Sequence, residues 1–419
     1  MPAAIGEVPA DPLGQGRAFL SAGDVRSAFA LWQAAAASGD AACQVELARA
    51  LLFGVGVDPD PHQALHWLAR AEAQGNLDAA LLLVQVSAGN TLLPCDEVIA
   101  ERLLRGVQAR HPLALRAVGV LFSRDGTDAA QRMATRLFEA AARRGDPIST
   151  QLFLERLSTG VISTGDAVPG VGFAAGLAAQ LAASGVAALP RTSPRSLTAT
   201  PAGVDAGPAR LDIEAFLSVP APLCLSERPV VQRLDGLLCA EECRLLMALA
   251  APLLRGSQVV DPDSGEGRPL LLRTSHDAQF DVLLEDPALR LVQARMARAA
   301  GLPLAHAEPL IVLRYEPGQE YRPHRDYLGP EAIARDRPEA GNRLRSLCVY
   351  LNDVDAGGAT EFQRAGLRVE PRAGDAVLFD NLLPDGSPDT ESLHAGLPVE
   401  RGVKWLATLW FRERAYRYF

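Results

Sequence analysis

The chain has 419 residues, of which 48% are hydrophobic and 22% are charged, and its formal net charge is −9. This length is too great for one ordinary core, so we expect a soluble protein of two or three domains. The acidic balance argues against a surface that coats nucleic acid, and no apolar run is long enough to span a membrane. The N-terminus lacks a signal-peptide pattern, and the six cysteines show no paired zinc spacing. A reducing cytoplasm is therefore the expected location.

An alanine-rich repeat occupies the first predicted domain, residues 1–160, and becomes clear after residue 17. The pair Gly-Asp recurs at Gly23-Asp24, Gly39-Asp40 and Gly145-Asp146, and the best-defined unit has a period of about 36 residues. Alanines let paired helices approach closely, and glycines end helices. The pattern indicates a stacked helical solenoid, with a plain alanine-rich bundle as the alternative. It resembles Sel1-like repeats, relatives of tetratricopeptide repeats, and this resemblance implies a surface for protein docking.

The composition changes over residues 161–210, where glycine, proline, serine and threonine dominate. Residues 190–194 and 198–203 are the plainest examples. Residues 174–183 can form one more helix, and the rest is typical of a flexible linker.

The second domain is predicted to cover residues 211–419. Residues 240–254 and 287–300 show amphipathic helical periodicity. Short apolar strands then alternate with Gly, Pro and Asp turns, and their spacing predicts an antiparallel double-sheet jelly roll, or double-stranded β-helix, with flanking helices. The predicted strands are 309–315, 344–351, 359–362, 366–370, 375–379, 392–399 and 403–411. The charged segment 328–341 lacks a regular pattern and is either a surface loop or a substrate lid.

The triplet His324-Arg325-Asp326 is the candidate centre of this domain. Pro323 disfavours helix before it, and in an extended chain the side chains of His324 and Asp326 point the same way. Together with a third ligand, His394, they match the 2-His-1-carboxylate set that holds non-heme Fe(II). By itself a His-x-Asp triplet is more often an ordinary polar contact.

Lys404 begins a strand that is apolar on both faces, so we expect this strand to be buried. A lysine there is costly unless it meets an anion. Either Lys404 reaches solvent at the strand end, or it is a cation that anchors a carboxylate ligand near the metal.

Residues 211–419 resemble the 2-oxoglutarate/Fe(II) dioxygenase superfamily and, within it, the prolyl 4-hydroxylase group. The resemblance covers about half the chain and follows ordered motifs. These motifs are Arg273-Thr274-Ser275, Tyr315-x-x-Gly318-x-x-Tyr321-x-x-His324-x-Asp326, Arg343-x-x-Ser346-x-x-x-Tyr350-Leu351-Asn352, Gly357-Gly358-x-Thr360-x-Phe362, Pro371-x-x-Gly374-x-x-x-x-Phe379, and Ser392-Leu393-His394-Ala395-Gly396-x-Pro398-Val399-x-x-Gly402-x-Lys404-Trp405 with Trp410 beyond.

The resemblance implies that Fe(II) binds to His324, Asp326 and His394. It implies that 2-oxoglutarate and O2 take the open positions, that Lys404 pairs with the distant carboxylate of 2-oxoglutarate, and that ascorbate is the reductant. The resemblance implies two further contacts with the cosubstrate, from Tyr315 and from Ser346. At the position of Ser346 the family usually has threonine. The products are then succinate, CO2 and a hydroxylated C–H carbon, most simply a prolyl residue of a peptide or protein. Relatives that halogenate lack the carboxylate ligand, so Asp326 favours hydroxylation.

The residues Arg273, Arg343 and Trp410 can line a substrate groove, or they can be salt-bridged or core residues. Two other functions stay open: an oxygenase of the same fold that acts on a small molecule or nucleic acid, and a non-catalytic Sel1-repeat adaptor. The acidic charge and a lysine anchor argue against nucleobase dealkylation. The complete set of ligands and anchor argues against the adaptor.

Overall fold

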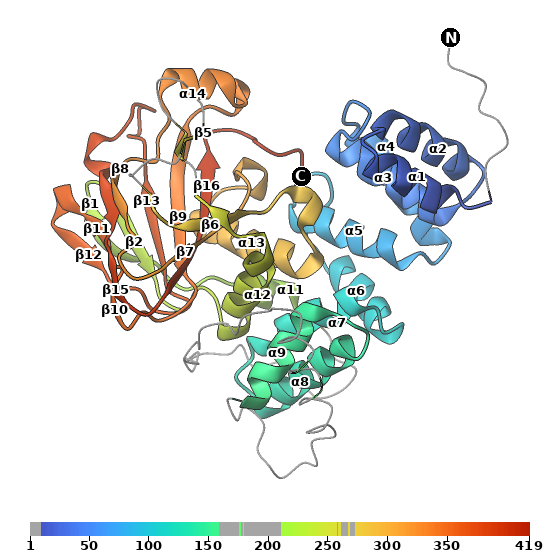
Figure 1. Cartoon of the computed structure of the whole chain (residues 1–419), viewed down its shortest axis with the longest axis horizontal. Coiled ribbons are helices and arrows are strands. Elements are labelled where there is room, and N and C mark those ends of the chain that lie inside the picture. The colour runs from blue at the N-terminus through green and yellow to red at the C-terminus, as the bar shows by residue number, and fades with distance from the viewer. Residues whose placement is uncertain are drawn as a thin grey trace.

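The structure is a computed structural model that describes residues 10–158, 211–257 and 273–419, with isolated positions at 176, 179, 259–260 and 267–268. A helical array lies on one side of the molecule, and a β-rich unit with covering helices lies on the other (Figure 1). The predicted linker 161–210 and the helix at 174–183 fall outside the described residues, apart from two single positions. The domain boundaries at 160 and 210 therefore stay a prediction.

The helical array follows the chain, and each helix packs on the next one in the sequence. Such nearest-neighbour stacking is what a solenoid predicts. The helices are α1 (Pro12–Ser21), α2 (Val25–Ala37), α3 (Ala41–Phe53), α4 (Pro61–Ala73), α5 (Leu77–Ala88), α6 (Val98–Gln108), α7 (Pro112–Ser123), α8 (Asp128–Ala142) and α9 (Pro147–Ser158). Within the described residues, none of the helices is long and apolar enough to cross a membrane.

The recurring Gly-Asp pair marks where one helix ends and the next begins. Gly23 and Gly39 have positive φ angles of 80° and 105°, which glycine adopts without steric cost. The next residue caps the following helix, because the Asp24 carboxylate accepts from Ser27 N at 3.1 Å and the Asp40 carboxylate accepts from Cys43 N at 2.8 Å.

The second unit has two main antiparallel sheets with the strand orders β1-β2-β13-β9-β16-β7-β6-β3 and β12-β11-β14-β8. Buried side chains from both sheets, among them Tyr315, Phe362 and Phe379, form one apolar cluster. The predicted jelly roll is confirmed. The strands of the two sheets are β1 (Leu223–Glu227), β2 (Val230–Leu234), β3 (Arg255–Gly256), β6 (His276–Gln279), β7 (Ile311–Tyr315), β8 (Tyr321–His324), β9 (Arg343–Tyr350), β11 (Thr360–Phe362), β12 (Leu367–Val369), β13 (Ala376–Asp380), β14 (His394–Gly396) and β16 (Lys404–Arg412); β10 (Ala356–Gly357) pairs with β15 (Val399–Arg401), and β4 (Val259–Val260) pairs with β5 (Gly267–Arg268).

Two predicted elements are divided into two parts, and proline explains both. The predicted strand 392–399 is interrupted, because Pro398 has no N–H to continue the ladder, and the chain forms β14 and then β15. The predicted helix 240–254 ends as α12 at Ala250 and continues as a 3-10 turn over Ala251–Leu253, which contains Pro252.

The helices α12 (Ala240–Ala250) and α13 (Pro287–Ala300) pack on strands of the larger sheet, and α11 (Ile213–Leu217) packs on α13. The prediction for α13 is confirmed at both ends. Asp286 caps its N-terminus through the N–H groups of Ala288 and Leu289, and Gly301 ends it with a φ of 68°.

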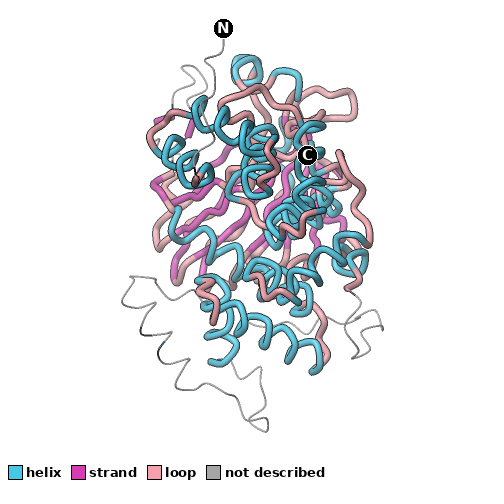
Figure 2. The backbone as a smooth tube through the Cα atoms, turned by 90° about the vertical axis from the view of Figure 1, so that its right-hand side faces the viewer, coloured by secondary structure: helices cyan, strands magenta, loops and turns pink. Residues whose placement is uncertain are grey.

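The helical array packs on the same two helices of the β-rich unit. α5 and α7 contact α13, while α7 and α9 contact α12, and Figure 2 shows the helices in front of the strands. One buried apolar cluster extends from Leu81 in α5 to Phe411 in β16. Phe419 packs among residues of α2 to α5. The two halves therefore share a core.

The segment 328–341 is not structureless, which corrects the sequence prediction. It contains the short helix α14 (Pro330–Arg335) and a 3-10 turn at Pro338–Ala340. Both are shorter than the helices that periodicity can detect. The Arg412 guanidinium pairs with Asp336 at 2.6 Å and so ties the segment to the end of β16. This contact favours a docked surface element over a free lid.

Candidate metal centre

His324, Asp326 and His394 come together at the smaller sheet. β14 pairs with β8 so that His394 lies opposite His324, and Asp326 follows two residues after the end of β8. One ligand atom from each side chain lies within 4.8 Å of the other two. His324 Nε2 is 3.5 Å from Asp326 Oδ1, and His394 Nε2 is 3.8 Å from Asp326 Oδ2. The register of one strand pair thus assembles the predicted ligand set.

Both imidazoles are oriented by the same local contact. His324 Nδ1 lies 2.8 Å from the Arg322 carbonyl, and His394 Nδ1 lies 2.9 Å from the Ser392 carbonyl. A carbonyl only accepts hydrogen bonds, so each Nδ1 carries a proton, and Nε2 is the atom of each ring that can offer a lone pair to a metal. Both Nε2 atoms face Asp326.

The electrostatics give His394 and Asp326 the protonation states that a metal requires. Burial, assisted by His324, lowers the pKa of His394 to about 4. Burial alone would raise the pKa of Asp326, but the neighbouring His394, His324 and Arg343 outweigh it and hold that pKa well below its usual range. At neutral pH, His394 is therefore neutral and Asp326 is ionised, which is the ligand form for a divalent cation.

Lys404 lies at the start of β16 and is 2% exposed, so it does not reach solvent. Its Nζ donates to the Gly358 carbonyl at 2.6 Å, and burial lowers its pKa to about 8. Among the described residues, no carboxylate forms an ion pair with it. Gly358 has a φ of 74°, which favours glycine, and a Cβ there would lie 3.2 Å from Lys404 Cδ, a tight contact.

The Lys404 ammonium lies between two buried tyrosine rings. Its Nζ is 5.4 Å from the Tyr315 ring centroid and 5.5 Å from the Tyr350 ring centroid. Tyr315 lies directly opposite Lys404 in the β7–β16 pairing, and burial raises its pKa. The structure thus places Tyr315 and Tyr350 beside Lys404. The contact of Tyr315 with the cosubstrate stays a prediction, and Tyr350 lies in a family motif but was given no role there.

Ser346 lies away from Lys404. It is opposite Trp410 in the β9–β16 pairing, and its hydroxyl donates to Asp326 Oδ2 at 2.7 Å. Ser346 therefore contacts the ligand carboxylate, and its expected contact with the cosubstrate stays a prediction. Trp410 behaves in the same way, because its Nε1 donates to Asp326 Oδ2 at 2.9 Å.

The two arginines expected in a substrate groove are engaged with the protein. The Arg343 guanidinium donates to both carboxylate oxygens of Glu308, at 2.7 and 2.8 Å, and lies 3.7 Å from a Trp410 ring centroid. Arg273 contacts Asp277 at 3.3 Å and lies over the Tyr321 ring. Arg273, Arg343 and Trp410 are thus paired or packed in the protein, and a role in a substrate groove stays a prediction.

Sequence reasoning missed two further residues at the site. The Tyr321 ring stacks on His324, with centroids 3.4 Å apart and planes 14° apart. Asn381 Nδ2 donates to Ser346 Oγ at 2.9 Å. Tyr321 falls within a quoted motif and was available as a signal. Asn381 lies two residues beyond Phe379, the last residue of its motif, and no spacing rule connects it with Ser346.

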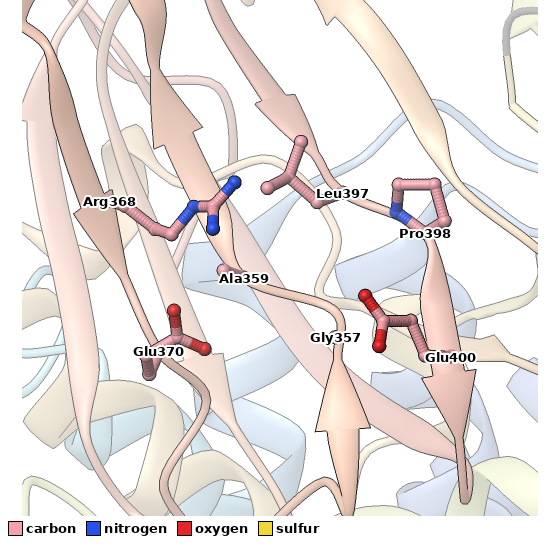
Figure 3. Close-up of a pocket in the computed structure, with 7 residues that line it drawn as sticks. All are labelled: Gly357, Ala359, Arg368, Glu370, Leu397, Pro398 and Glu400. Carbon is pink, nitrogen blue, oxygen red and sulfur yellow. The ribbon is translucent and has the colours of Figure 1, made fainter.

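A cavity of about 340 Å³ is lined by residues in and around the β10–β15 pair and by Arg368 of β12 (Figure 3). Its wall includes Gly357 and Ala359, which flank the Gly358 carbonyl that Lys404 contacts. The lining residues are Gly357, Ala359, Arg368, Glu370, Leu397, Pro398 and Glu400. None of them is a candidate ligand, so this cavity is not the metal centre.

Comparisons with known families agree with this geometry. Residues 310–412 match the 2OG-Fe(II) oxygenase superfamily. Residues 13–40, 41–76 and 112–146 match the Sel1 repeat. The resemblance to Sel1 repeats is confirmed, and the alternative of a plain alanine-rich bundle is excluded.

Similar proteins fall in one group. The chain is 36% identical over 212 residues to probable prolyl 4-hydroxylase 3 of Arabidopsis thaliana. The matched region covers 46% of this chain and 72% of that protein. It is 36% identical over 209 residues to prolyl 4-hydroxylase 1 of the same plant, with the same coverage of 46% and 72%. Among solved structures, a viral collagen prolyl hydroxylase from Paramecium Bursaria Chlorella virus-1 is 27% identical, covering 43% of this chain and 95% of that one, with a TM-score of 0.34.

The fold and the assembled site define a 2-oxoglutarate/Fe(II) oxygenase. More narrowly, the chain belongs to the prolyl 4-hydroxylase family of that superfamily, preceded by Sel1 repeats.

The residues present fit the groups that this family implies. Two imidazole nitrogens and one carboxylate converge within 4.8 Å, which is the donor set of Fe(II) oxygenases. A buried ammonium group without a carboxylate among the described residues fits a dianionic cosubstrate. The donor set thus suits Fe(II), and the Lys404 ammonium group, which has no carboxylate partner among the described residues, suits 2-oxoglutarate.

Proposed function

We propose that the chain is an Fe(II)- and 2-oxoglutarate-dependent dioxygenase that hydroxylates a prolyl residue of a peptide or protein and releases succinate and CO2. One observation carries the proposal: a convergent ligand set and a buried ammonium group with no carboxylate partner among the described residues occur in the same barrel. Membership in the prolyl 4-hydroxylase family supports the prolyl substrate.

In this proposal His324, Asp326 and His394 hold the iron on one face and leave the remaining positions for cosubstrate and O2. When bound, Fe(II) with 2-oxoglutarate supplies the oxidising power for hydroxylating an unactivated C–H bond. Asp326 fills the carboxylate position, so the site is set for hydroxylation rather than halogenation.

Lys404 is proposed to bind the distal carboxylate of 2-oxoglutarate. The contact would be strong, because the ammonium group is buried and charge-assisted hydrogen bonds gain strength where water is excluded. The rings of Phe362 and Phe379 lie 5.6 and 4.6 Å from the His394 ring and form apolar walls beside it. These walls keep water from the reacting centre.

Three finer assignments belong to the same proposal. Ascorbate is the reductant that keeps the iron ferrous. The Sel1 repeats dock the protein substrate or a regulatory protein, since repeat arrays present extended surfaces. The protein works in the cytoplasm, where six unpaired cysteines are stable.

Turnover with a defined substrate tests the function. Purified protein with Fe(II), 2-oxoglutarate and ascorbate is mixed with a proline-rich peptide, and succinate and the peptide mass are measured. We expect succinate release to rise with the peptide and the peptide to gain one oxygen, and His394→Ala to abolish both. The matched control is the same peptide with its prolines replaced by alanine.

Other outcomes would overturn parts of the proposal. Stimulation by an oligonucleotide or a small molecule, with none by the peptide, would replace the prolyl substrate and keep the chemistry. Equal succinate release by wild type and His394→Ala would contradict the oxygenase itself and leave the adaptor function.

A further inference from the structure

The Asp326 carboxylate is held asymmetrically. Its Oδ2 atom accepts two short hydrogen bonds, from Ser346 Oγ at 2.7 Å and from Trp410 Nε1 at 2.9 Å. Each oxygen also has one longer contact with a ligand imidazole: Oδ1 lies 3.5 Å from His324 Nε2, and Oδ2 lies 3.8 Å from His394 Nε2. Two donors use the hydrogen-bonding capacity of Oδ2, so Oδ1 is the oxygen with free lone pairs.

A second layer fixes the direction of the serine donor. Asn381 Nδ2 donates to Ser346 Oγ at 2.9 Å, so the Ser346 hydroxyl hydrogen is directed toward Asp326. Ser346, Asn381 and Asp326 are buried, with 0%, 0% and 5% exposure. Water therefore cannot easily replace either hydrogen bond, and losing one leaves a buried acceptor unsatisfied.

A separate layer fixes the indole. Arg343 lies 3.7 Å from the ring centroid of Trp410, and Glu308 holds that guanidinium with two hydrogen bonds. Arg343 Nη1 also donates to the Asp326 main-chain carbonyl at 3.4 Å. The indole, the arginine and the main chain of Asp326 thus restrain one another.

We propose that Trp410 and Ser346 are positioning residues that make Asp326 a one-oxygen ligand, with Oδ2 reserved for hydrogen bonds and Oδ1 presented to the metal. The inference rests on the proposed function, since it assumes that Asp326 ligates iron. It assigns a role to Trp410, whose motif position alone implied a substrate groove, and to Ser346, which the resemblance placed on the cosubstrate.

Metal affinity, measured without turnover, tests the proposal. Anaerobic calorimetric titration with Co(II) is compared for wild type, Trp410→Phe and Ser346→Ala in the full chain. Hydrogen-bond partners of metal ligands typically account for about 10- to 100-fold in affinity, and we expect a loss in that range for each variant. Removing a donor also changes how the carboxylate binds, so the visible d–d spectrum of the Co(II) complex should shift.

Two controls separate positioning from general damage to the fold. Trp405→Phe makes the same replacement on the opposite face of β16, in the apolar cluster, and should keep wild-type Co(II) affinity. Ser346→Thr restores the hydroxyl and should recover most of the affinity that Ser346→Ala loses. Asn381→Asp converts the amide donor into an acceptor, so it should reproduce the loss seen with Ser346→Ala.

The results distinguish a failure of the proposed function from a failure of the positioning role. If wild type fails to bind Co(II) or Fe(II), the proposed function and the inference both fall. If wild type binds and both Trp410→Phe and Ser346→Ala bind equally well with the same spectrum, the inference is wrong and the metal site stands. Equal losses in Trp410→Phe and Trp405→Phe would show a packing effect and would also overturn the positioning role.

Discussion

Buried cations occur in two regions of this chain, and the two regions treat them differently. Between the helical array and the helices α12 and α13, the buried Arg116, Arg156 and Arg295 each pair with a carboxylate. In the barrel, Lys404 is equally buried but contacts the Gly358 carbonyl and, among the described residues, no carboxylate. Moving a charge out of water is costly unless it is paired. The paired arginines therefore indicate structure, and the unpaired lysine indicates a ligand site.

The paired region also shows how the two halves are joined. Arg116 in α7 reaches Asp146 at 2.6 Å within the array and Asp286 at 2.8 Å at the start of α13. Arg156 in α9 reaches Glu241 in α12 at 2.5 Å. Such contacts fix orientation as well as position, so we expect the array and the barrel to unfold together.

The largest effect should come from breaking a paired site. Glu242 accepts from Arg295 on α13 and from Arg124 at the end of α7, and these arginines outweigh burial and lower its pKa to about 2. Glu242→Gln leaves the buried Arg295 and the partly buried Arg124 without their carboxylate. We expect a loss of about 3–5 kcal/mol in the free energy of unfolding, measured by urea denaturation. A loss below about 1 kcal/mol would contradict the structural role of this pairing.

Removing the Lys404 charge should not destabilise the protein, in contrast to Glu242→Gln. Lys404→Met removes a buried charge that has no carboxylate partner in the described part of the chain, so the stability of the ligand-free protein should be unchanged or higher. The affinity for 2-oxoglutarate should fall about 100-fold, because a buried charged contact is lost. Thermal unfolding and equilibrium titration measure the two quantities on the same protein. A strongly destabilised variant with normal 2-oxoglutarate affinity would reverse the comparison.

A pH titration sharpens the same comparison. The pKa of Lys404 is about 8 in the folded chain and 10.5 as an ordinary lysine, so the unfolded state binds more protons between these values. Burying Lys404 therefore lowers the free energy of unfolding by its full amount below pH 8. This destabilisation decreases as the pH rises from 8 toward 10.5. Binding 2-oxoglutarate requires the protonated lysine, so Kd should rise up to about tenfold per pH unit above pH 8. Lys404→Met should lack this slope.

The smallest effect should come from an exposed pair beside the interface. Arg298 and Glu214 lie 2.7 Å apart, but their side chains are 39% and 69% exposed. Solvent screens such pairs, so Glu214→Gln should lower the free energy of unfolding by less than about 1 kcal/mol. The same urea denaturation used for Glu242→Gln provides the measurement. An effect as large as that of Glu242→Gln would show that pairing distance, rather than burial, decides the outcome.

The sequence was sufficient for the features that depend on local chemistry. Gly-Asp pairs predicted helix boundaries because the glycine conformation and the aspartate cap act within a few residues. The spacing of His324 and Asp326 predicted a shared face because an extended strand alternates its side chains. His394 and Lys404 could be joined to them only through an ordered family motif.

The rest depended on contacts that span long stretches of sequence. Ser346 and Trp410 meet Asp326 through the pairing of β9 with β16, and no local pattern specifies that register. The interface between the array and α13 depends on pairs such as Arg116 with Asp286. Charges of this kind resemble surface residues in the sequence. The short α14 helix lacked enough turns to show a period.

Anaerobic titration of the Fe(II)-loaded protein with 2-oxoglutarate tests the central claim most directly. The readout is the weak visible charge-transfer absorption of the iron chelate. We expect a saturating band in wild type, no band in His394→Ala, and saturation at about 100-fold higher concentration in Lys404→Met. An absent band in wild type, or superimposable titrations of wild type and Lys404→Met, would contradict the account.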